Sequence, residues 1–191
     1  MLYAIKKVTM IKKLLLVLTI LTLFSCGDEN DDIYKTKSEE FASKKGNFIA
    51  DFPTKPYYSS IDNQIGLDKF QTHLIRSTLG ENKVFSIEYI DYPQYMIKST
   101  SNEQLFAQIV TNFTNKMADS FDLDFQKPIE QHGLKGQYFV LKLNQYAISK
   151  GIIGHIEGKI FRNGNRVFTV TYLGRYDKNT DPFMSSFRLL K

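Results

Sequence analysis

Few residues of the chain have the types and spacing that catalysis or metal binding needs. The three histidines lie far apart in the sequence, and the chain has no second cysteine to complete a zinc site with them. They are His73, His132 and His155. No G-x-S-x-G turn is present for a serine nucleophile, and the glycines at 151, 154 and 158 lie inside a strand-like segment rather than at the start of a helix. The sequence therefore predicts no enzyme activity, no metal site and no cofactor.

Cys26, the single cysteine of the chain, is the residue with the clearest chemical prediction. A secreted domain that relies on disulfides carries an even number of cysteines, so a lone thiol does not indicate a disulfide framework. An eleven-residue run from Leu14 to Phe24, apolar except for two threonines, follows Lys12 and Lys13 and ends two residues before this cysteine. This run suits the core of a signal peptide, because a spanning helix needs about 20 such residues. We therefore expect residues 1–25 to direct export.

The segment Leu23-Phe24-Ser25-Cys26 resembles the lipobox of bacterial lipoproteins, with an apolar residue three positions before the cysteine and a small residue just before it. The resemblance implies cleavage before Cys26, acyl chains on Cys26 and attachment to a membrane. The acidic residues at 28–32 resemble the export signal of lipoproteins in Bacteroidetes-type bacteria, which implies an outer-membrane location and transfer to the cell surface. A solvated spacer is the alternative interpretation of these acidic residues.

The excess of basic over acidic residues in the chain comes mainly from the predicted signal peptide. Four of the 25 basic residues lie in residues 1–25, which contain no acidic residue, so the mature chain keeps 21 basic residues beside all 20 acidic ones. The sequence pI of about 9.1 is therefore no reason to expect nucleic-acid binding.

The mature chain is predicted to consist of a tether and one domain. Residues 26–45 have low hydrophobicity and mixed charge, which favours a flexible acidic tether. Residues 46–191 form a segment long enough for one hydrophobic core, which should consist of Phe, Tyr, Ile, Leu and Val because the chain has no tryptophan.

One convincing helix is expected, with strands on both sides of it. Ser101 and Gln104 have the spacing of a capping box, and apolar residues at three- and four-residue steps follow as far as Met117. Asn163-Gly164 predicts a type I′ hairpin turn, and Asp181-Pro182 predicts a short C-terminal helix. The expected strands cover residues 47–53, 57–61, 69–77, 83–92, 124–131, 136–143, 146–162 and 166–170.

The order of aromatic, proline and glycine positions resembles the PsbP-like superfamily. The resemblance depends on Phe52-Pro53-Thr54-Lys55-Pro56, Phe85-Ser86-Ile87-Glu88-Tyr89, Tyr92-Pro93 and Phe183-Met184-Ser185-Ser186-Phe187. It implies an α+β fold, an α/β/α sandwich with a twisted antiparallel sheet, one main amphipathic helix and a short C-terminal helix. It also implies a non-enzymatic module, because members of the superfamily typically bind or help assemble other proteins. No functional residue of the superfamily can be matched to this chain.

These observations lead to two functional hypotheses. The first is a cell-envelope lipoprotein that binds or assembles an envelope protein through its sheet face or a tyrosine-rich edge, since tyrosines suit binding surfaces. The alternative is a lipid or small-molecule carrier in which the curved sheet encloses a cavity, and an undetected hydrolase is the weakest reading. The tyrosines concerned are Tyr57, Tyr58, Tyr89, Tyr92, Tyr95, Tyr138, Tyr146, Tyr172 and Tyr176, many of which equally suit half-buried strands.

Overall fold

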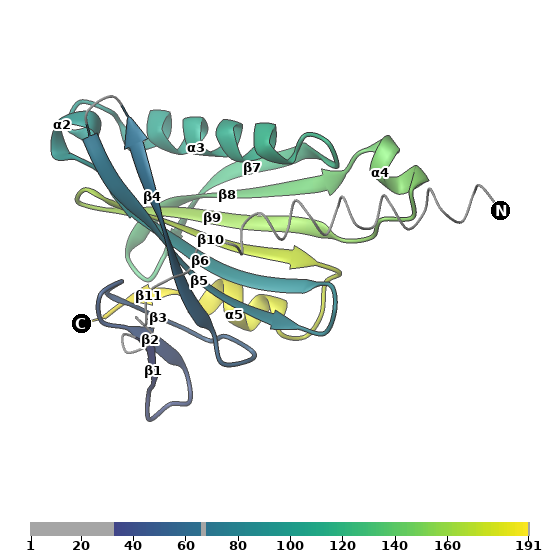
Figure 1. The fold of residues 1–191 in the computed structure, drawn as a ribbon, viewed down its shortest axis with the longest axis horizontal. Helices are drawn as coiled ribbons and strands as arrows, with labels where there is room; N and C mark the ends of the chain where they lie inside the picture. Colours follow the sequence, from purple (N-terminus) through teal and green to yellow (C-terminus); the bar gives the residue numbers. More distant parts are fainter. Residues whose placement is uncertain (1–32, 66–67, 191) are drawn as a thin grey trace.

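A large twisted antiparallel sheet forms the centre of the computed structural model, which describes residues 33–65 and 68–190 (Figure 1). Its strand order is β4–β5–β6–β10–β9–β8–β7, so β4 and β7 are its edges. The strands are β4 (Tyr57–Ile65), β5 (Asp68–Leu79), β6 (Lys83–Asp91), β7 (Phe121–Gln131), β8 (Leu134–Leu143), β9 (His155–Asn163) and β10 (Arg166–Gly174).

A second, smaller antiparallel sheet packs against one face of the large sheet, with strand order β1–β2–β3–β11. Its strands are β1 (Ile33–Lys35), β2 (Phe41–Ser43), β3 (Phe48–Ala50) and β11 (Arg188–Leu189). The helices are α2 (Gln94–Ile97), α3 (Asn102–Met117), α4 (Gln145–Ser149) and α5 (Thr180–Ser186). No helix of the described residues has the length and apolar character needed to cross a membrane.

The predicted fold class is wrong in its balance of helix and strand. We expected an α+β sandwich with one sheet, one main helix and a short C-terminal helix, whereas the protein is mostly β, with two sheets and four helices in the described residues. The difference arises because strands from both ends of the described chain, including β1 and β11, form a sheet where the prediction had none.

The prediction of a flexible tether at 26–45 is wrong for residues 33–45. This segment contains β1 and β2, and Ala42 and Ser43 are buried. The two strands form because β2 pairs with β3 in register, with Phe41 opposite Ala50, and the bidentate ion pair between Arg188 and Glu40 fixes the connection to β11. The folded part described by the structure thus begins at Ile33 rather than at Gly46.

Two hydrophobic clusters hold the layers together, one on each face of the large sheet. Between the sheets, the buried ring of Phe187 lies 5.1 Å from that of Phe168 and 5.3 Å from that of Phe161, measured between ring centroids. On the opposite face, Phe106 and Val110 of α3 pack with Phe139 of β8. Burial of side chains of this size contributes roughly 1.5–3 kcal/mol each.

The helix prediction was accurate, and the turn prediction was displaced by one residue. Ser101 Oγ accepts a hydrogen bond from the Gln104 amide, and the Gln104 side chain accepts one from the Ser101 amide, which completes the capping box. In the β9–β10 hairpin, Asn163 pairs with Arg166, so Gly164 and Asn165 form the loop. Only Gly164 has positive φ, at 63°, which is typical of a type II′ turn instead of the expected type I′.

The predicted strand at 146–162 is replaced by two elements. Residues 145–149 form α4, because the Asn144 side chain accepts a hydrogen bond from the Ala147 amide and caps the helix. The strand β9 begins only at His155. Gly158 lies within it, and a Cβ atom at this position would be 2.0 Å from Cζ of Phe139 on β8.

Strand β7 is an eleven-residue edge strand that pairs only with β8 in the described part of the chain. The register shifts between Leu123 and Phe125, which indicates a β-bulge, and Pro128 lies farther along the same strand.

Candidate interaction face

The large sheet presents a set of polar side chains on the face that also carries α3. Arg76 of β5 pairs with Ser86 of β6, which pairs with Thr171 of β10, and in the neighbouring row Glu88 pairs with Thr169. Because side chains at alternate positions of a strand point to the same side, these five residues share one face. All five are half-buried. We call them the polar face.

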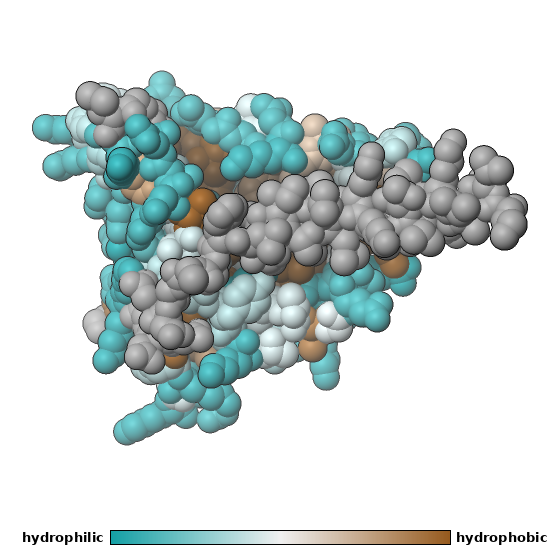
Figure 2. All heavy atoms as spheres, viewed as in Figure 1, coloured by the Kyte–Doolittle hydropathy of each residue, from teal (hydrophilic) through white to brown (hydrophobic). Residues whose placement is uncertain are grey.

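The helix α3 lies to one side of the polar face. It contacts mainly β7 and β8, on the far side of β9 and β10 from Glu88 (Figure 1). Figure 2 shows mostly hydrophilic side chains along the outer surface of this helix. Lys116, in its last turn, is exposed and near enough to Glu88 to act on it electrostatically.

The charges of the polar face are not neutralised by hydrogen bonds. Burial raises the pKa of Glu88, while Lys116 and Arg76 oppose this rise through space, without a hydrogen bond to the carboxylate. Arg76 Nε is buried and has no hydrogen-bond partner among the described residues. Ser86 and Thr171 satisfy each other, with 2.7 Å between their hydroxyl oxygens. The polar face therefore combines an acid and a base that have no hydrogen-bonded partner in the part of the chain that the structure describes.

A second polar cluster lies on the opposite face of the large sheet. Tyr138 OH donates a hydrogen bond to Glu157 Oε2, and His155 Nε2 lies 2.8 Å from Glu157 Oε1. Burial, followed by the bond to Glu157, raises the pKa of Tyr138, and burial lowers the pKa of Lys159. Lys159 Nζ donates to Gln131 Oε1 and to the carbonyl oxygen of Met184. These contacts hold α5 against β7 and β9, so we interpret the cluster as structural.

The three histidines lie in separate environments. The ring of His73 stacks on Tyr89, with 4.4 Å between centroids, and its Nδ1 lies 2.6 Å from the Tyr58 hydroxyl. His132 Nε2 lies 3.0 Å from the carbonyl oxygen of Ser185. Within residues 33–65 and 68–190, no group of three or more His, Cys, Asp and Glu side chains is arranged to hold a metal ion.

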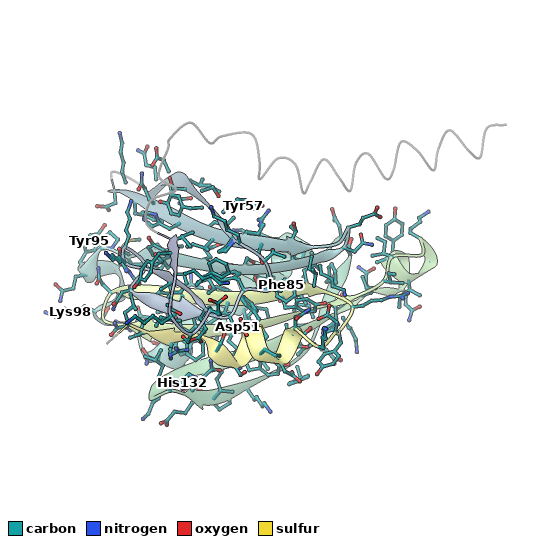
Figure 3. All side chains as sticks on the ribbon, turned by 90° about the horizontal axis from the view of Figure 1, so that it is seen from below. Asp51, Tyr57, Phe85, Tyr95, Lys98 and His132 are labelled. Carbon is teal, nitrogen blue, oxygen red and sulfur yellow. The ribbon has the colours of Figure 1, made fainter. Side chains whose placement is uncertain are left out.

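The tyrosines do not form the tyrosine-rich edge that we considered. Tyr89 and Tyr172 are fully buried. Tyr57 and Tyr95 are exposed but come from β4 and α2, and Figure 3 shows Tyr95 near Lys98 at one end of the molecule, with Tyr57 closer to the middle. Tyr146 is exposed on α4. The aromatic surface is therefore distributed over several elements.

One end of the molecule carries an apolar projection, which we call the α4 tip. It consists of Tyr146, Ile148 and Ile153, which are 58%, 53% and 50% exposed. The Lys150 ammonium lies 5.2 Å from the centroid of the Tyr146 ring. Large apolar side chains that gather at an exposed site often indicate an interaction surface.

The sequence alone did not predict the polar face. The site residue that it did predict is Cys26. Arg76 and Glu88 are twelve positions apart, and only the β5–β6 register places them on neighbouring strands. The available signal was the alternation in β6, where Ser86 and Glu88 share one side. Cys26 and the acidic residues at 28–32 lie outside the described residues.

Comparison with known proteins supports the fold only. No family model matches the chain, and no curated protein matches it. A solution structure of cyanobacterial PsbP (CyanoP) from Synechocystis sp. PCC 6803 is similar, with a TM-score of 0.51 and 11% sequence identity. The similarity covers 87% of this chain and 98% of that one. The PsbP-like fold is thus confirmed, while the resemblance to bacterial lipoproteins stays a prediction.

Proposed function

We propose that this protein is a lipid-anchored component of the bacterial cell envelope that acts as a non-enzymatic protein-binding or assembly module. The main support for this proposal is the polar face, on which Glu88 and Arg76 are half-buried and have no hydrogen-bonded partner within residues 33–65 and 68–190. A charged side chain that is half-buried without a paired charge destabilises the protein. A binding partner that pairs these charges removes the cost, which favours the complex. The proposed partner is a protein segment with a basic group for Glu88 and an acidic group for Arg76.

Site-specific crosslinking in cells tests this proposal. A photo-reactive phenylalanine at Thr169 should give a discrete crosslinked protein, because Thr169 pairs with Glu88 on the polar face. The same group at Gln108, which is exposed on α3, provides the matched control. The Thr169 product should disappear in a variant with Glu88→Gln and Arg76→Gln. An identical product from Gln108, or a Thr169 product that survives both substitutions, contradicts the proposal.

A carrier of amphiphilic molecules is the second candidate, and one observation favours it. Apolar side chains flank the charges on the same face, with Leu74 directly opposite Glu88 and Ile90 two positions along β6. In this role an acyl chain lies along the half-buried Ile90, beside the buried Leu74, while an anionic head group binds Arg76. Native mass spectrometry of the purified protein should then show a bound lipid that is lost with Arg76→Gln. A lipid-free spectrum, together with the Thr169 crosslink, rejects the carrier.

The anchoring part of the proposal has its own tests. Cys26→Ser should leave the chain unprocessed and separate it from membranes, since the acyl chains have no other attachment residue in this prediction. Neutral residues in place of Asp28, Glu29, Asp31 and Asp32 should preserve acylation but remove access of external protease to the domain. Membrane fractionation that is unchanged in Cys26→Ser rejects the lipoprotein assignment, and unchanged protease access rejects the export signal.

A further inference from the structure

The β1–β2 hairpin presents a basic and aromatic surface at the edge of the small sheet. Five exposed side chains form this surface, which we call the lysine hairpin. They are Tyr34, Lys35 and Lys37 in the hairpin and Lys44 and Lys45 in the turn that follows β2. The Lys44 ammonium lies 5.6 Å from the centroid of the Tyr34 ring, and the Lys45 ammonium lies 5.8 Å from that of Tyr58 on β4.

The acidic residues of the same hairpin are engaged within the protein. Glu39 forms an ion pair with Lys35 four residues earlier. Both carboxylate oxygens of Glu40 accept hydrogen bonds from Arg188, at 2.6 and 2.7 Å, and this contact lowers the pKa of Glu40. Counted together, Arg188 and the four lysines exceed Glu39 and Glu40 by three positive charges, so this surface keeps an excess of positive charge. Tyrosine and lysine together are typical of surfaces that meet lipid head groups, because the ring and the lysine stem are apolar and their ends are polar.

The chain length between the predicted anchor and the hairpin is short. Seven residue steps separate Cys26 from Ile33. A fully extended chain covers at most about 3.6 Å per residue, so Ile33 can lie no farther than about 25 Å from an anchored Cys26.

The α4 tip lies at the other end of the long strands. His132, in the turn just before β8, contacts Ser185 shortly before β11 of the small sheet. Asn144 follows the end of β8 and caps α4. The ten residues of β8 cover about 30 Å, and Figure 1 shows the small sheet and α4 at opposite ends of the molecule.

From these observations we propose that the lysine hairpin rests on the head groups of an anionic bilayer and that the α4 tip faces away from it. This inference rests on the proposed lipid anchor. The acidic residues at 28–32 lie between the anchor and β1 and are repelled by the same surface. The anchor, rather than net charge, therefore brings the domain to the bilayer, and the lysines decide which side of the domain meets it.

The composition of the chain allows a direct test, because the chain has one cysteine and no tryptophan. The mature chain is coupled through Cys26 to a maleimide lipid in vesicles of equal parts phosphatidylcholine and phosphatidylglycerol. Single tryptophans are introduced by Tyr34→Trp or, as the matched control, Tyr146→Trp, both at exposed tyrosines. Brominated lipids should quench the first tryptophan several-fold more than the second, and acrylamide in solution should show the reverse order.

The role of the lysines in orienting the domain is tested by replacing all four with glutamine in each tryptophan variant. The difference in quenching should then disappear, with thermal unfolding of the soluble protein as the check that the fold is intact. Equal quenching of both tryptophans, stronger quenching of Tyr146→Trp or an unchanged difference after lysine replacement overturns the proposal. Because the lipid is attached chemically, these results are independent of acylation in cells, which Cys26→Ser tests separately.

Discussion

At Glu88 the protein keeps a carboxyl group that its own fold does not favour in the charged form. Burial raises the pKa of Glu88, and the charges of Lys116 and Arg76 compensate only partly. Since the pKa is higher in the folded state than in the unfolded chain, the folded state binds the proton more tightly. Protonation thus adds stability that is fully present below the unfolded pKa and is lost as the pH rises through the folded pKa.

Glu88→Gln is therefore expected to stabilise the protein at pH 7, because it removes a buried negative charge. The gain in melting temperature should shrink as the pH falls toward the ordinary pKa of glutamate, where Glu88 is already neutral. Thermal unfolding of both proteins between pH 4 and 8 measures this. A loss of stability at pH 7 means that the carboxylate has a stabilising partner and contradicts the role given to it here.

Glu40→Gln is expected to change the stability at pH 7 in the opposite direction from Glu88→Gln. Its hydrogen bonds with Arg188 lower the pKa of Glu40, so its contribution to stability is present above the unfolded pKa and is lost as the pH falls through the folded pKa. The substitution should lower the melting temperature at pH 7 and have less effect in acid. The two variants should thus differ in sign at pH 7 under the same measurement.

At the scale of single elements, the β8–β9 pair depends on a glycine opposite an aromatic ring. Gly158→Ala places a methyl group where the Phe139 ring packs, and overpacking of this kind costs about 1–3 kcal/mol. Urea unfolding should show this loss. Phe139→Leu in the same chain should recover part of it, because a smaller side chain leaves room for the methyl group. Additive losses in the double variant indicate that the two sites are not coupled.

The start of α3 should depend on Ser101. Ser101→Ala removes the side-chain acceptor for the Gln104 amide and is expected to lower the free energy of unfolding by about 1 kcal/mol. Gln108→Ala, at an exposed position of the same helix, should change it by no more than about 0.5 kcal/mol. Urea unfolding of the two variants distinguishes the cap from a general effect of helix substitution.

Elements with strong local signals were predictable from the sequence. The helix α3 and its cap follow from the Ser101–Gln104 spacing, and the turn at His132-Gly133 connects β7 and β8 as expected. The strand β9 was predicted too long, because the glycine spacing suggested one bent strand and the Asn144 cap that begins α4 was not recognised. Arg76 and Ser86 lie on different strands, so no local sequence pattern indicates that they pair.

At the scale of the whole molecule, the β1–β2 hairpin should be needed for full stability. A chain that begins at Ile33 should melt at the same temperature as the mature chain from Cys26. A chain that begins at Gly46 loses the buried Ala42 and the Glu40–Arg188 ion pair, and should lose about 3 kcal/mol or more of unfolding free energy. Equal melting of all three chains indicates that the hairpin is dispensable, as the tether prediction assumed.

The overall architecture was only partly predictable. The PsbP-like resemblance was correct for the fold, and the large antiparallel sheet was expected. The small sheet was not, because its strands have two or three residues each and depend on pairing between segments from both ends of the described chain. Short strands with little pattern of their own form only when the rest of the domain provides a surface for them.

The edge strand β7 has a consequence for a protein that we propose to be held on a membrane. Anchoring confines neighbouring copies to two dimensions, where long exposed strand edges meet often and can join into continuous sheets. Pro128 cannot donate to such a ladder, and the bulge between Leu123 and Phe125 bends the strand away from a flat edge. We therefore expect the β7 edge to resist pairing between neighbouring copies.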